Sequence, residues 1–216
     1  MVGALRASAP RSIAGLYALT PDHSDTGEMI ECVAAALEGG ATAVQYRNTT
    51  AAPKLRLQQA RALRSLCVGR GATFIINDDI DLARSVDADG VHLGRGDATI
   101  ALARARLGTT SLIGASCYDS LERAEAAVAA GADYIAFGSF FPSNTKPDAV
   151  RAELPLLSSA KARWNVPVVA IGGITPGNAG ALIDAGADSV AVISALFDAG
   201  DVAAAARSFV ALFSKR

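Results

Sequence analysis

The chain alternates short apolar runs with longer stretches in which apolar residues recur every three or four positions. Short apolar runs indicate buried strands, and the longer spacing indicates amphipathic helices, as in the stretch that begins at Asp119. Eight strands are expected, four of them introduced by a weak small-residue repeat. The repeats start at positions 39, 86, 130 and 185 (GGATAVQYR, VDADGVHLG, AGADYIAFG and AGADSVAVI), and the other strands follow Gly15, Ala72, Ser111 and Pro167. Gly131 and Gly186 stand where a helix ends on a left-handed residue.

Eight strand-then-helix units predict parallel pairing, because right-handed crossovers carry each helix back over the sheet. A closed barrel and an open doubly wound sheet both satisfy this rule. The count of eight and the near-regular spacing favour the barrel, so we expect an α/β fold, a single-domain (βα)8 TIM barrel with parallel strands. Residues 1–13 are expected to be a flexible N-terminal tail, and residues 14–216 to be the barrel and catalytic domain.

Charge and cysteine content narrow the class of protein. The 216 residues include 20 Lys and Arg against 21 Asp and Glu, so no global field favours nucleic acid or an anionic membrane. We expect neither a signal peptide nor a membrane span, because no long uninterrupted apolar stretch occurs. The three cysteines are an odd number without C-x-x-C spacing, which argues against a disulfide framework or a zinc site. A reducing cytoplasm is the expected location.

The carboxyl ends of the expected strands carry polar or flexible residues. In a barrel of this kind the active site forms at that face. Helix capping and turns explain any one of these residues alone, but the convergence of all eight strand ends favours a site. The residues are Thr20, Asp22, Gln45, Arg47, Asn77, Asp78, Asp79, His92, Asp97, Ser116, Gly138, Ser139, Gly172, Gly173 and Ser194.

A glycine pair near the seventh strand indicates a phosphate site. Gly172 and Gly173 would let backbone N–H groups approach a ligand, and Thr175 would then open a helix with Pro176 at its first position. Ser194, at a helix start after the eighth strand, would supply the other half. A simple tight turn is the alternative, but two matched loops after strands seven and eight favour phosphate.

Two aspartates from consecutive unit ends suggest a metal. Asp78 and Asp97 without a histidine cluster suit Mg²⁺, which keeps waters and shares its shell with substrate phosphates. Asp79 has a competing role as the N-cap of the next helix. His92 is expected to be a wall residue rather than a base. Cys117 is expected to be a packed thiol rather than a nucleophile.

The segment FGSFFPSNTKPD is long for a connection between a strand and a helix, and it contains Lys146. Long polar loops in compact domains are often lids or binding loops. Over a site with two carboxylates, an arginine and a phosphate cup, Lys146 would clamp a second, diphosphate-sized anion. The alternative is an exposed loop with a solvated lysine.

From about Leu16 to Phe213 the chain resembles the thiamine phosphate synthase family. The resemblance is carried in order by LYALTPD, VQYR, INDD, ADGVHLGRGD, GAS, ADYIAFGSFFPSNTKPD, VVAIGGITPGNA and AGADSVAVISALF. It implies a Mg²⁺-dependent transferase of thiamine biosynthesis. Such an enzyme joins a hydroxymethylpyrimidine diphosphate to a thiazole phosphate by dissociative substitution, giving thiamine phosphate and pyrophosphate. Its partners would be these small-molecule substrates. Binding to nucleic acid or to a membrane is not expected, and the sequence leaves assembly into a homo-oligomer undecided.

The resemblance also implies roles for individual residues. Pyrimidine diphosphate binding is implied for Gln45, Tyr46, Arg47, Asn48, Thr49, Asn77, Ser116 and Lys146, of which Arg47, Ser116 and Lys146 would be catalytic. Thiazole phosphate binding is implied for Ser143, Asn144, Thr145, Gly173, Ile193 and Ser194. Asp78 and Asp97 would bind Mg²⁺.

One position departs from the family. Its strand-two motif usually runs Q-x-R-x-K, and Thr49 stands at the lysine position, which removes one cation from the diphosphate site. A thiazole tautomerase-like enzyme is the nearest rival, but it would not need Asn77, Asp78, Asp97 and Lys146. A non-catalytic binder of thiazole phosphate or thiamine phosphate is favoured only by the missing lysine. A phosphosugar isomerase or epimerase would leave the aspartate pair unexplained.

Overall fold

The computed structural model describes residues 13–142 and 150–214, and within these ranges eight parallel strands form a closed barrel. The strands are β1 (Gly15–Leu19), β2 (Ala43–Tyr46), β3 (Thr73–Asn77), β4 (Gly90–Leu93), β5 (Leu112–Tyr118), β6 (Tyr134–Phe137), β7 (Val168–Ile171) and β8 (Ser189–Val192). The last strand pairs with the first, with Gly15 opposite Ser189. The predicted barrel is confirmed, and the open sheet is excluded.

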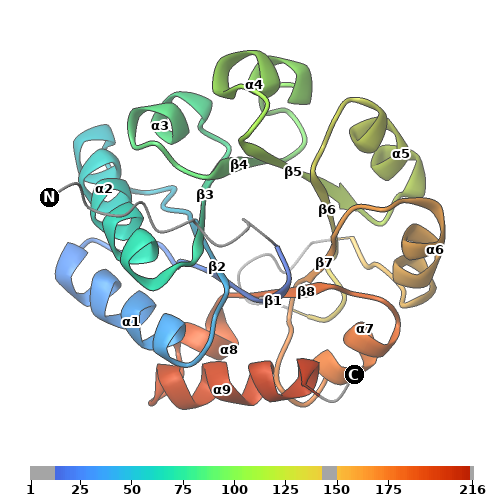
Figure 1. Cartoon of the computed structure of the whole chain (residues 1–216). Coiled ribbons are helices and arrows are strands. Elements are labelled where there is room, and N and C mark those ends of the chain that lie inside the picture. The colour runs from blue at the N-terminus through green and yellow to red at the C-terminus, as the bar shows by residue number, and fades with distance from the viewer. Residues whose placement is uncertain (1–12, 143–149, 215–216) are drawn as a thin grey trace, which may run out of the picture.

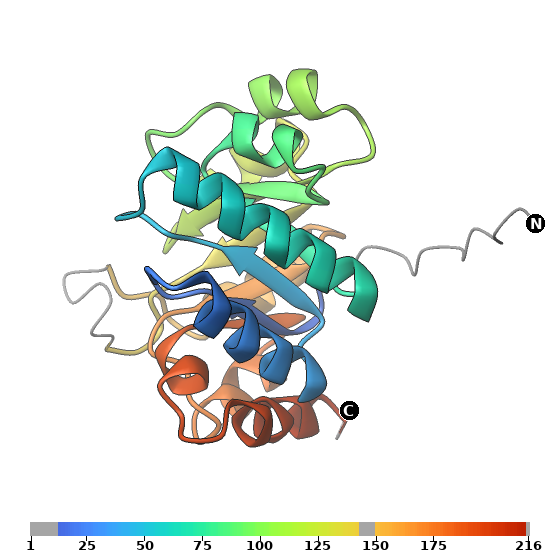
Figure 2. The same ribbon diagram turned by 90° about the vertical axis from the view of Figure 1, so that its left-hand side faces the viewer.

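The helices surround the ring of strands, as Figure 1 shows. They are α1 (Thr26–Glu38), α2 (Pro53–Arg70), α3 (Ile80–Ser85), α4 (Ile100–Leu107), α5 (Leu121–Ala129), α6 (Pro155–Arg163), α7 (Ala179–Asp184), α8 (Ser194–Phe197) and α9 (Val202–Phe213). Figure 2 shows α1 and α2 side by side over the outside of the sheet. Several helices start at a side-chain cap, and Asp79 accepts the Leu82 N–H at the start of α3, so its predicted capping role is confirmed.

Hydrophobic residues of the described chain pack in two places. The larger group lies between the strands and the helices, and the smaller one fills the inside of the barrel. Inside, Tyr17 and Tyr134 are fully buried, and Gly114 makes room for the Tyr134 ring, because a Cβ there would lie 2.0 Å from Cζ of Tyr134. Ile13, which we expected in the tail, is also buried in this interior group. The rest of the predicted tail, residues 1–12, lies outside the described residues.

The Ala-Asp of the internal repeat has a structural purpose. Asp89, Asp133 and Asp188 each stand just before a strand and accept a backbone N–H from the preceding strand, at 2.7 to 2.8 Å. Each also pairs with a basic side chain, Arg64, Arg104 or Lys161 respectively. The aspartates of the repeat therefore connect neighbouring strands at the amino-terminal end of the barrel, the face that contributes to stability rather than to catalysis.

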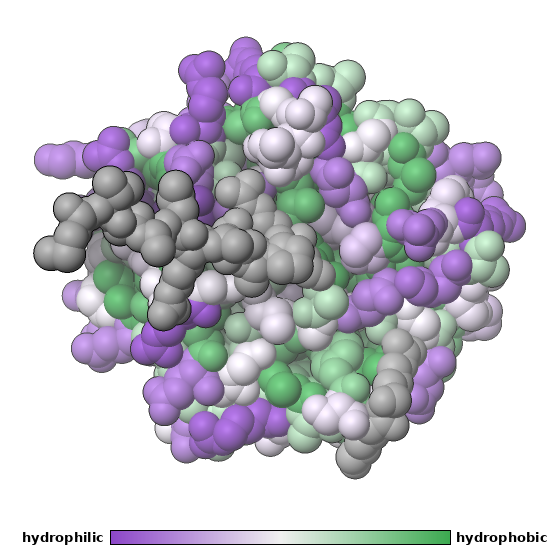
Figure 3. All heavy atoms as spheres, in the orientation of Figure 1, coloured by the Kyte–Doolittle hydropathy of each residue, from purple (hydrophilic) through white to green (hydrophobic). Residues whose placement is uncertain are grey.

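The predicted glycine helix ends are confirmed, because Gly131 and Gly186 follow α5 and α7 with φ of 93° and 115°. On the face seen in Figure 3, hydrophilic residues are interspersed with smaller hydrophobic groups. Among the described residues, none of the helices combines the length and the apolar character that crossing a bilayer requires.

Candidate active site

A cavity of about 560 Å³ opens at the carboxyl ends of the strands. Each strand of the barrel contributes a residue to it or to its rim, as the barrel rule predicts. The residues singled out from the sequence that line it are Gln45, Arg47, Thr49, Asn77, Asp78, His92, Asp97, Ser116, Gly138, Ser139, Gly172, Gly173, Ile193 and Ser194. Side chains far apart in the sequence thus share one space of the size that small-molecule ligands occupy.

A chain of hydrogen bonds crosses the floor of this cavity. The amide of Gln45 donates to the Tyr17 hydroxyl (2.8 Å), which meets the Tyr134 hydroxyl at 3.1 Å. His92 continues the chain, with Nδ1 3.1 Å from the Tyr134 hydroxyl and Nε2 2.9 Å from the hydroxyl of Ser116. Burial raises the pKa of both tyrosines, so they stay neutral. The chain fixes Gln45 and Ser116 on opposite sides of the barrel.

The sequence did not predict this chain of hydrogen bonds. Tyr17 and Tyr134 look like ordinary strand residues, and only their inward alternation along β1 and β6 could have suggested a place inside the barrel. His92 was expected to be a wall residue rather than a base, and its place in the wall of the cavity is confirmed. Its ring stacks on Tyr134 with centroids 5.4 Å apart, and both of its nitrogens have hydrogen-bond partners.

Asp22 organises the end of β2. Its carboxylate lies 3.2 Å from a guanidinium nitrogen of Arg47 and accepts hydrogen bonds from the Thr49 hydroxyl (2.7 Å) and the Thr49 N–H (2.9 Å). Burial by itself would raise the pKa of Asp22, but the Thr49 hydrogen bonds and the charge of Arg47 lower it below its ordinary value. Asp22 therefore stays ionised and holds both residues at the edge of the cavity.

Two residues of the expected diphosphate set lie elsewhere. The Tyr46 hydroxyl donates to Oε1 of Gln59 on α2 (2.8 Å), and the Asn48 amide donates to the same oxygen (3.0 Å) and to the backbone carbonyl of His23 (2.7 Å). Successive residues of a strand point to opposite faces, so Tyr46 points away from the barrel interior that Gln45 faces. Neither Tyr46 nor Asn48 lines the central cavity.

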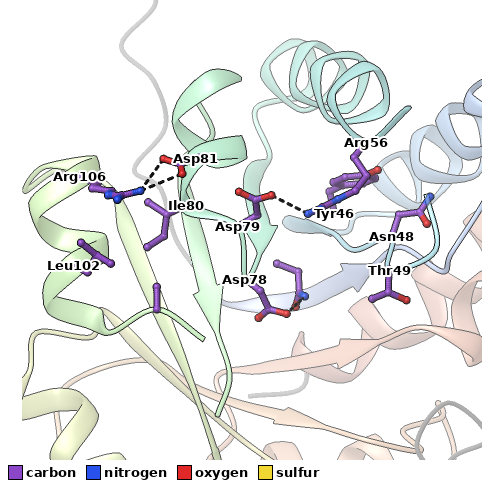
Figure 4. A pocket seen from close by; sticks show the side chains of 12 residues that line it. Tyr46, Asn48, Thr49, Arg56, Asp78, Asp79, Ile80, Asp81, Leu102 and Arg106 are labelled. Carbon is purple, nitrogen blue, oxygen red and sulfur yellow. Dashed lines mark hydrogen bonds and ion pairs between the residues drawn. The ribbon is translucent and has the colours of Figure 1, made fainter. Parts of the chain in front are cut away.

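Both residues instead line a second cavity of about 490 Å³ beside the barrel mouth, drawn in Figure 4. Its basic side chains are engaged, because Arg56 pairs with Asp79 at 3.0 Å and Arg106 pairs with Asp81 at 2.9 Å. The two cavities share Thr49, Asn77 and Asp78. Position 49 therefore lies where the two spaces meet.

The aspartate pair expected to bind metal is brought together. Oδ2 of Asp97 accepts the Gly94 N–H at 2.7 Å, and Asp78 accepts a hydrogen bond from the Asn77 amide. A Cβ added to Gly94 would lie 2.9 Å from Oδ2 of Asp97 and 4.0 Å from Oδ1 of Asp78, so both carboxylates border the same space. Among the described residues no three His, Cys, Asp or Glu gather as a metal cluster. Two carboxylates beside an open cavity fit a hard cation that completes its shell with water and substrate oxygens.

The proposed phosphate cup lies across the cavity. Gly172 and Gly173 adopt φ of 101° and 63°, and a Cβ on Gly173 would meet the Pro142 carbonyl oxygen at 2.3 Å, so glycine is required there. Ser194 begins α8 as expected, directly after Ile193. Backbone and hydroxyl groups from two loops thus border one side of the cavity.

The helix expected at Thr175 was wrong. The segment forms a turn, and α7 begins only at Ala179. The Asn178 side chain accepts the Thr175 N–H at 2.8 Å and donates to the Gly173 carbonyl at 3.1 Å, which holds the turn closed. The half of the expected cup after β7 is therefore bordered by a loop rather than by a helix N-terminus.

Cys117 is buried on β5, and burial raises the pKa of its thiol to about 12. Its burial confirms the expectation of a packed cysteine. The expected ligands Ser143, Asn144, Thr145 and Lys146 lie outside the described residues. Their roles remain predictions.

Comparison with known proteins identifies the family. The family model described as thiamine monophosphate synthase matches residues 16–196. A thiamine-phosphate synthase of Chromobacterium violaceum is 54% identical over 207 residues, covering 96% of this chain and 100% of that protein. One from an Azoarcus species is 55% identical over 202 residues, covering 94% and 98%.

A solved structure agrees with these relatives. The thiamine phosphate pyrophosphorylase of Pyrococcus furiosus superposes with a TM-score of 0.83 at 37% identity, covering 94% of this chain and 96% of that one. The tautomerase-like, non-catalytic and phosphosugar alternatives are not favoured by these matches. The family model, the relatives and the solved structure agree, and the chain belongs to the thiamine monophosphate synthase family.

Proposed function

We propose that this transferase joins a hydroxymethylpyrimidine diphosphate to a thiazole phosphate with the help of Mg²⁺, and releases pyrophosphate. One observation carries the proposal: a pair of carboxylates with Arg47 and a cup of backbone groups at Gly173 border the same cavity. The first set suits a diphosphate that brings a metal ion, and the second suits a monophosphate. Two anionic substrates of different chemistry would thus be held face to face.

At the diphosphate end, Asp78 and Asp97 would hold Mg²⁺, and Arg47, Asn77 and Lys146 would bind the diphosphate oxygens. Bound there, Mg²⁺ would neutralise negative charge on the departing oxygens. Arg47 is oriented by Asp22, so its guanidinium is positioned before the substrate arrives. Gln45 and Ser116 would meet the pyrimidine from the cavity floor, where the hydrogen-bond chain fixes their side chains.

At the other end, the backbone around Gly173 and the start of α8 at Ile193 and Ser194 would bind the thiazole phosphate. Ser143, Asn144 and Thr145 would complete that site from the loop after β6. In this arrangement the thiazole ring would lie between its phosphate and the pyrimidine, which places its nitrogen toward the reacting carbon.

The chemistry requires charge stabilisation and positioning rather than a side-chain nucleophile. The bond between the pyrimidine methylene carbon and the diphosphate oxygen breaks first, and its electron pair leaves with pyrophosphate. The thiazole nitrogen then donates its lone pair to the methylene carbon and forms the C–N bond. The raised pKa of the buried Cys117 thiol and the hydrogen bonds to both nitrogens of His92 agree with a site in which neither residue acts as a nucleophile.

The test is a coupled assay for pyrophosphate with chromatographic detection of thiamine phosphate. Purified protein given both substrates and Mg²⁺ should form both products, and Asp78→Ala or Asp97→Ala should nearly stop the reaction. Asp81→Ala is the matched control, because Asp81 pairs with Arg106 and borders only the second cavity. If the wild type gives no product at any Mg²⁺ concentration, the proposal fails. Cytoplasmic location and a homo-oligomeric state remain predictions.

A further inference from the structure

We propose that Arg95 is a further diphosphate-binding residue, reaching the leaving pyrophosphate from the β4 side of the cavity. The inference deepens the proposed function and rests on it for the identity of the anion. Arg95 is exposed, lies in the loop after β4, two residues before Asp97, and lines the central cavity. It therefore stands beside the carboxylate pair that would hold Mg²⁺ and so beside the place where a metal-bound diphosphate would lie.

Tyr118 holds Arg95 in place. The Tyr118 hydroxyl accepts the backbone N–H of Arg95 at 3.1 Å, and the guanidinium carbon lies 5.2 Å from the centre of the Tyr118 ring. The pairing of β5 with β6 is irregular between Ser116 and Tyr118, and Tyr118 has a φ of 57°. Tyr118 and Arg95 both line the cavity. Two separate contacts thus restrain one exposed arginine at the rim.

The charge balance of the cavity leaves Arg95 available. In the described part of the chain, the Lys and Arg side chains that line it are Arg47 and Arg95. Arg47 forms an ion pair with Asp22, whereas Arg95 has no carboxylate partner among the residues that the structure describes. Thr49 supplies no charge, and its hydroxyl and N–H both donate to Asp22. A diphosphate entering the cavity would provide the anion that Arg95 lacks.

The chemistry of arginine suits this role. A guanidinium held over an aromatic ring by a cation–π contact still has N–H groups to donate, and these match two oxygens of a phosphate in a planar, bidentate contact. Because Tyr118 already restrains the side chain, less conformational freedom is lost on binding. Arg95 would contact pyrophosphate both as part of the substrate and as the departing product.

The chain provides a matched control in Arg123. Its guanidinium carbon lies 5.3 Å from the centre of the same Tyr118 ring, but it belongs to α5 and does not line the cavity. Arg95→Gln and Arg123→Gln therefore remove the same charge from the same ring, and only the first removes a side chain from the cavity.

The experiment measures binding of inorganic pyrophosphate with Mg²⁺ by calorimetry, alongside steady-state kinetics. Loss of a hydrogen bond to a charged group corresponds to roughly tenfold or more in affinity, so Arg95→Gln should raise the Kd for pyrophosphate and the KM for the pyrimidine diphosphate by about that factor. The KM for the thiazole phosphate should not change. Arg123→Gln should leave all three constants unchanged, and Arg95→Lys should restore part of the affinity.

Three results would overturn the inference. The first is an unchanged Kd for pyrophosphate in Arg95→Gln. The second is an equal loss of pyrophosphate affinity in Arg123→Gln, which would point to packing on Tyr118. The third is no pyrophosphate binding by the wild type. The two proposals fail separately. Weaker pyrophosphate binding in Arg95→Gln together with no thiamine phosphate from the wild type would reject the reaction and keep the anion contact. Normal turnover by both proteins with equal pyrophosphate affinity would reject only Arg95.

Discussion

Replacing Thr49 by lysine would place a cation where the two cavities meet. The Thr49 hydroxyl and N–H both donate to Asp22, and the residue lines the central cavity. A lysine would keep the N–H contact, lose the hydroxyl contact and extend its ammonium from the exposed edge of the cavity. If the diphosphate lies beside Arg47, that ammonium reaches it.

The magnitude follows from two opposing effects. A new hydrogen bond between charged groups is worth about 1.5 to 3 kcal/mol. The lost hydroxyl contact and competition from Asp22 for the new ammonium involve partly exposed groups, so together they offset about 1 kcal/mol after solvent screening. About 0.5 to 2 kcal/mol remains, which predicts a KM for the pyrimidine diphosphate about two- to thirtyfold lower.

Pyrophosphate release measured at varied pyrimidine diphosphate and saturating thiazole phosphate gives the KM. Thr50→Lys is the control, because Thr50 is also exposed but lines neither cavity. It adds the same charge one residue away and should leave the KM unchanged. The effect of Thr49→Lys should be larger in the Arg95→Gln background, where one cation is missing. An unchanged KM and kcat in both backgrounds would refute the placement of the diphosphate beside position 49.

Further predictions concern packing, pH and reactivity. Gly114→Ala should lower the free energy of unfolding in urea by about 1 to 3 kcal/mol, because its Cβ would overlap a buried ring, whereas Gly69→Ala, in open space on α2, should raise it by roughly 0.5 to 1 kcal/mol. A Gly114→Ala protein with the same free energy of unfolding as the wild type would contradict the overlap. Asp22→Asn should lower stability at neutral pH. Since the pKa of Asp22 is lower in the folded state, its contribution is complete above about pH 4 and disappears as the pH falls through the lowered pKa; a difference from wild type that persists in stronger acid would contradict this. Cys117, with its pKa raised to about 12, should resist alkylation at pH 8 while partly exposed Cys32 reacts, and mass spectrometry of the native protein distinguishes them.

Much of the architecture followed from local pattern. Apolar runs, amphipathic spacing and glycine helix ends predicted the strands and helices, and the parallel topology then required the polar strand ends to meet at one face. Gln45, Asn77, Asp97 and Ser116 line the cavity as that rule expects. The N-cap at Asp79 was also readable, because capping depends on residues within one turn.

Other features required the closed barrel. The hydrogen-bond chain joins Tyr17 to Tyr134 across 117 positions of sequence, and the grip of Asp22 on Thr49 joins separate units. No local pattern carries such contacts, since they exist only once β1 has β2 and β8 as neighbours. The direction of Tyr46, which sequence resemblance grouped with the diphosphate ligands, was likewise decided by the pleat of β2 and its contact with α2.

The sequence by itself therefore determined the repeating unit, the barrel and the face on which the chemistry gathers, because periodicity and crossover handedness are properties of short segments. The tertiary structure decided which of those residues share a space and which charges are already neutralised. Arg47 and Arg95 are both arginines in loops that follow a strand, and the sequence does not distinguish them. In the structure Arg47 pairs with Asp22, whereas Arg95 lies over the ring of Tyr118. That difference arises because charge balance within a cavity depends on neighbours brought together from distant parts of the chain.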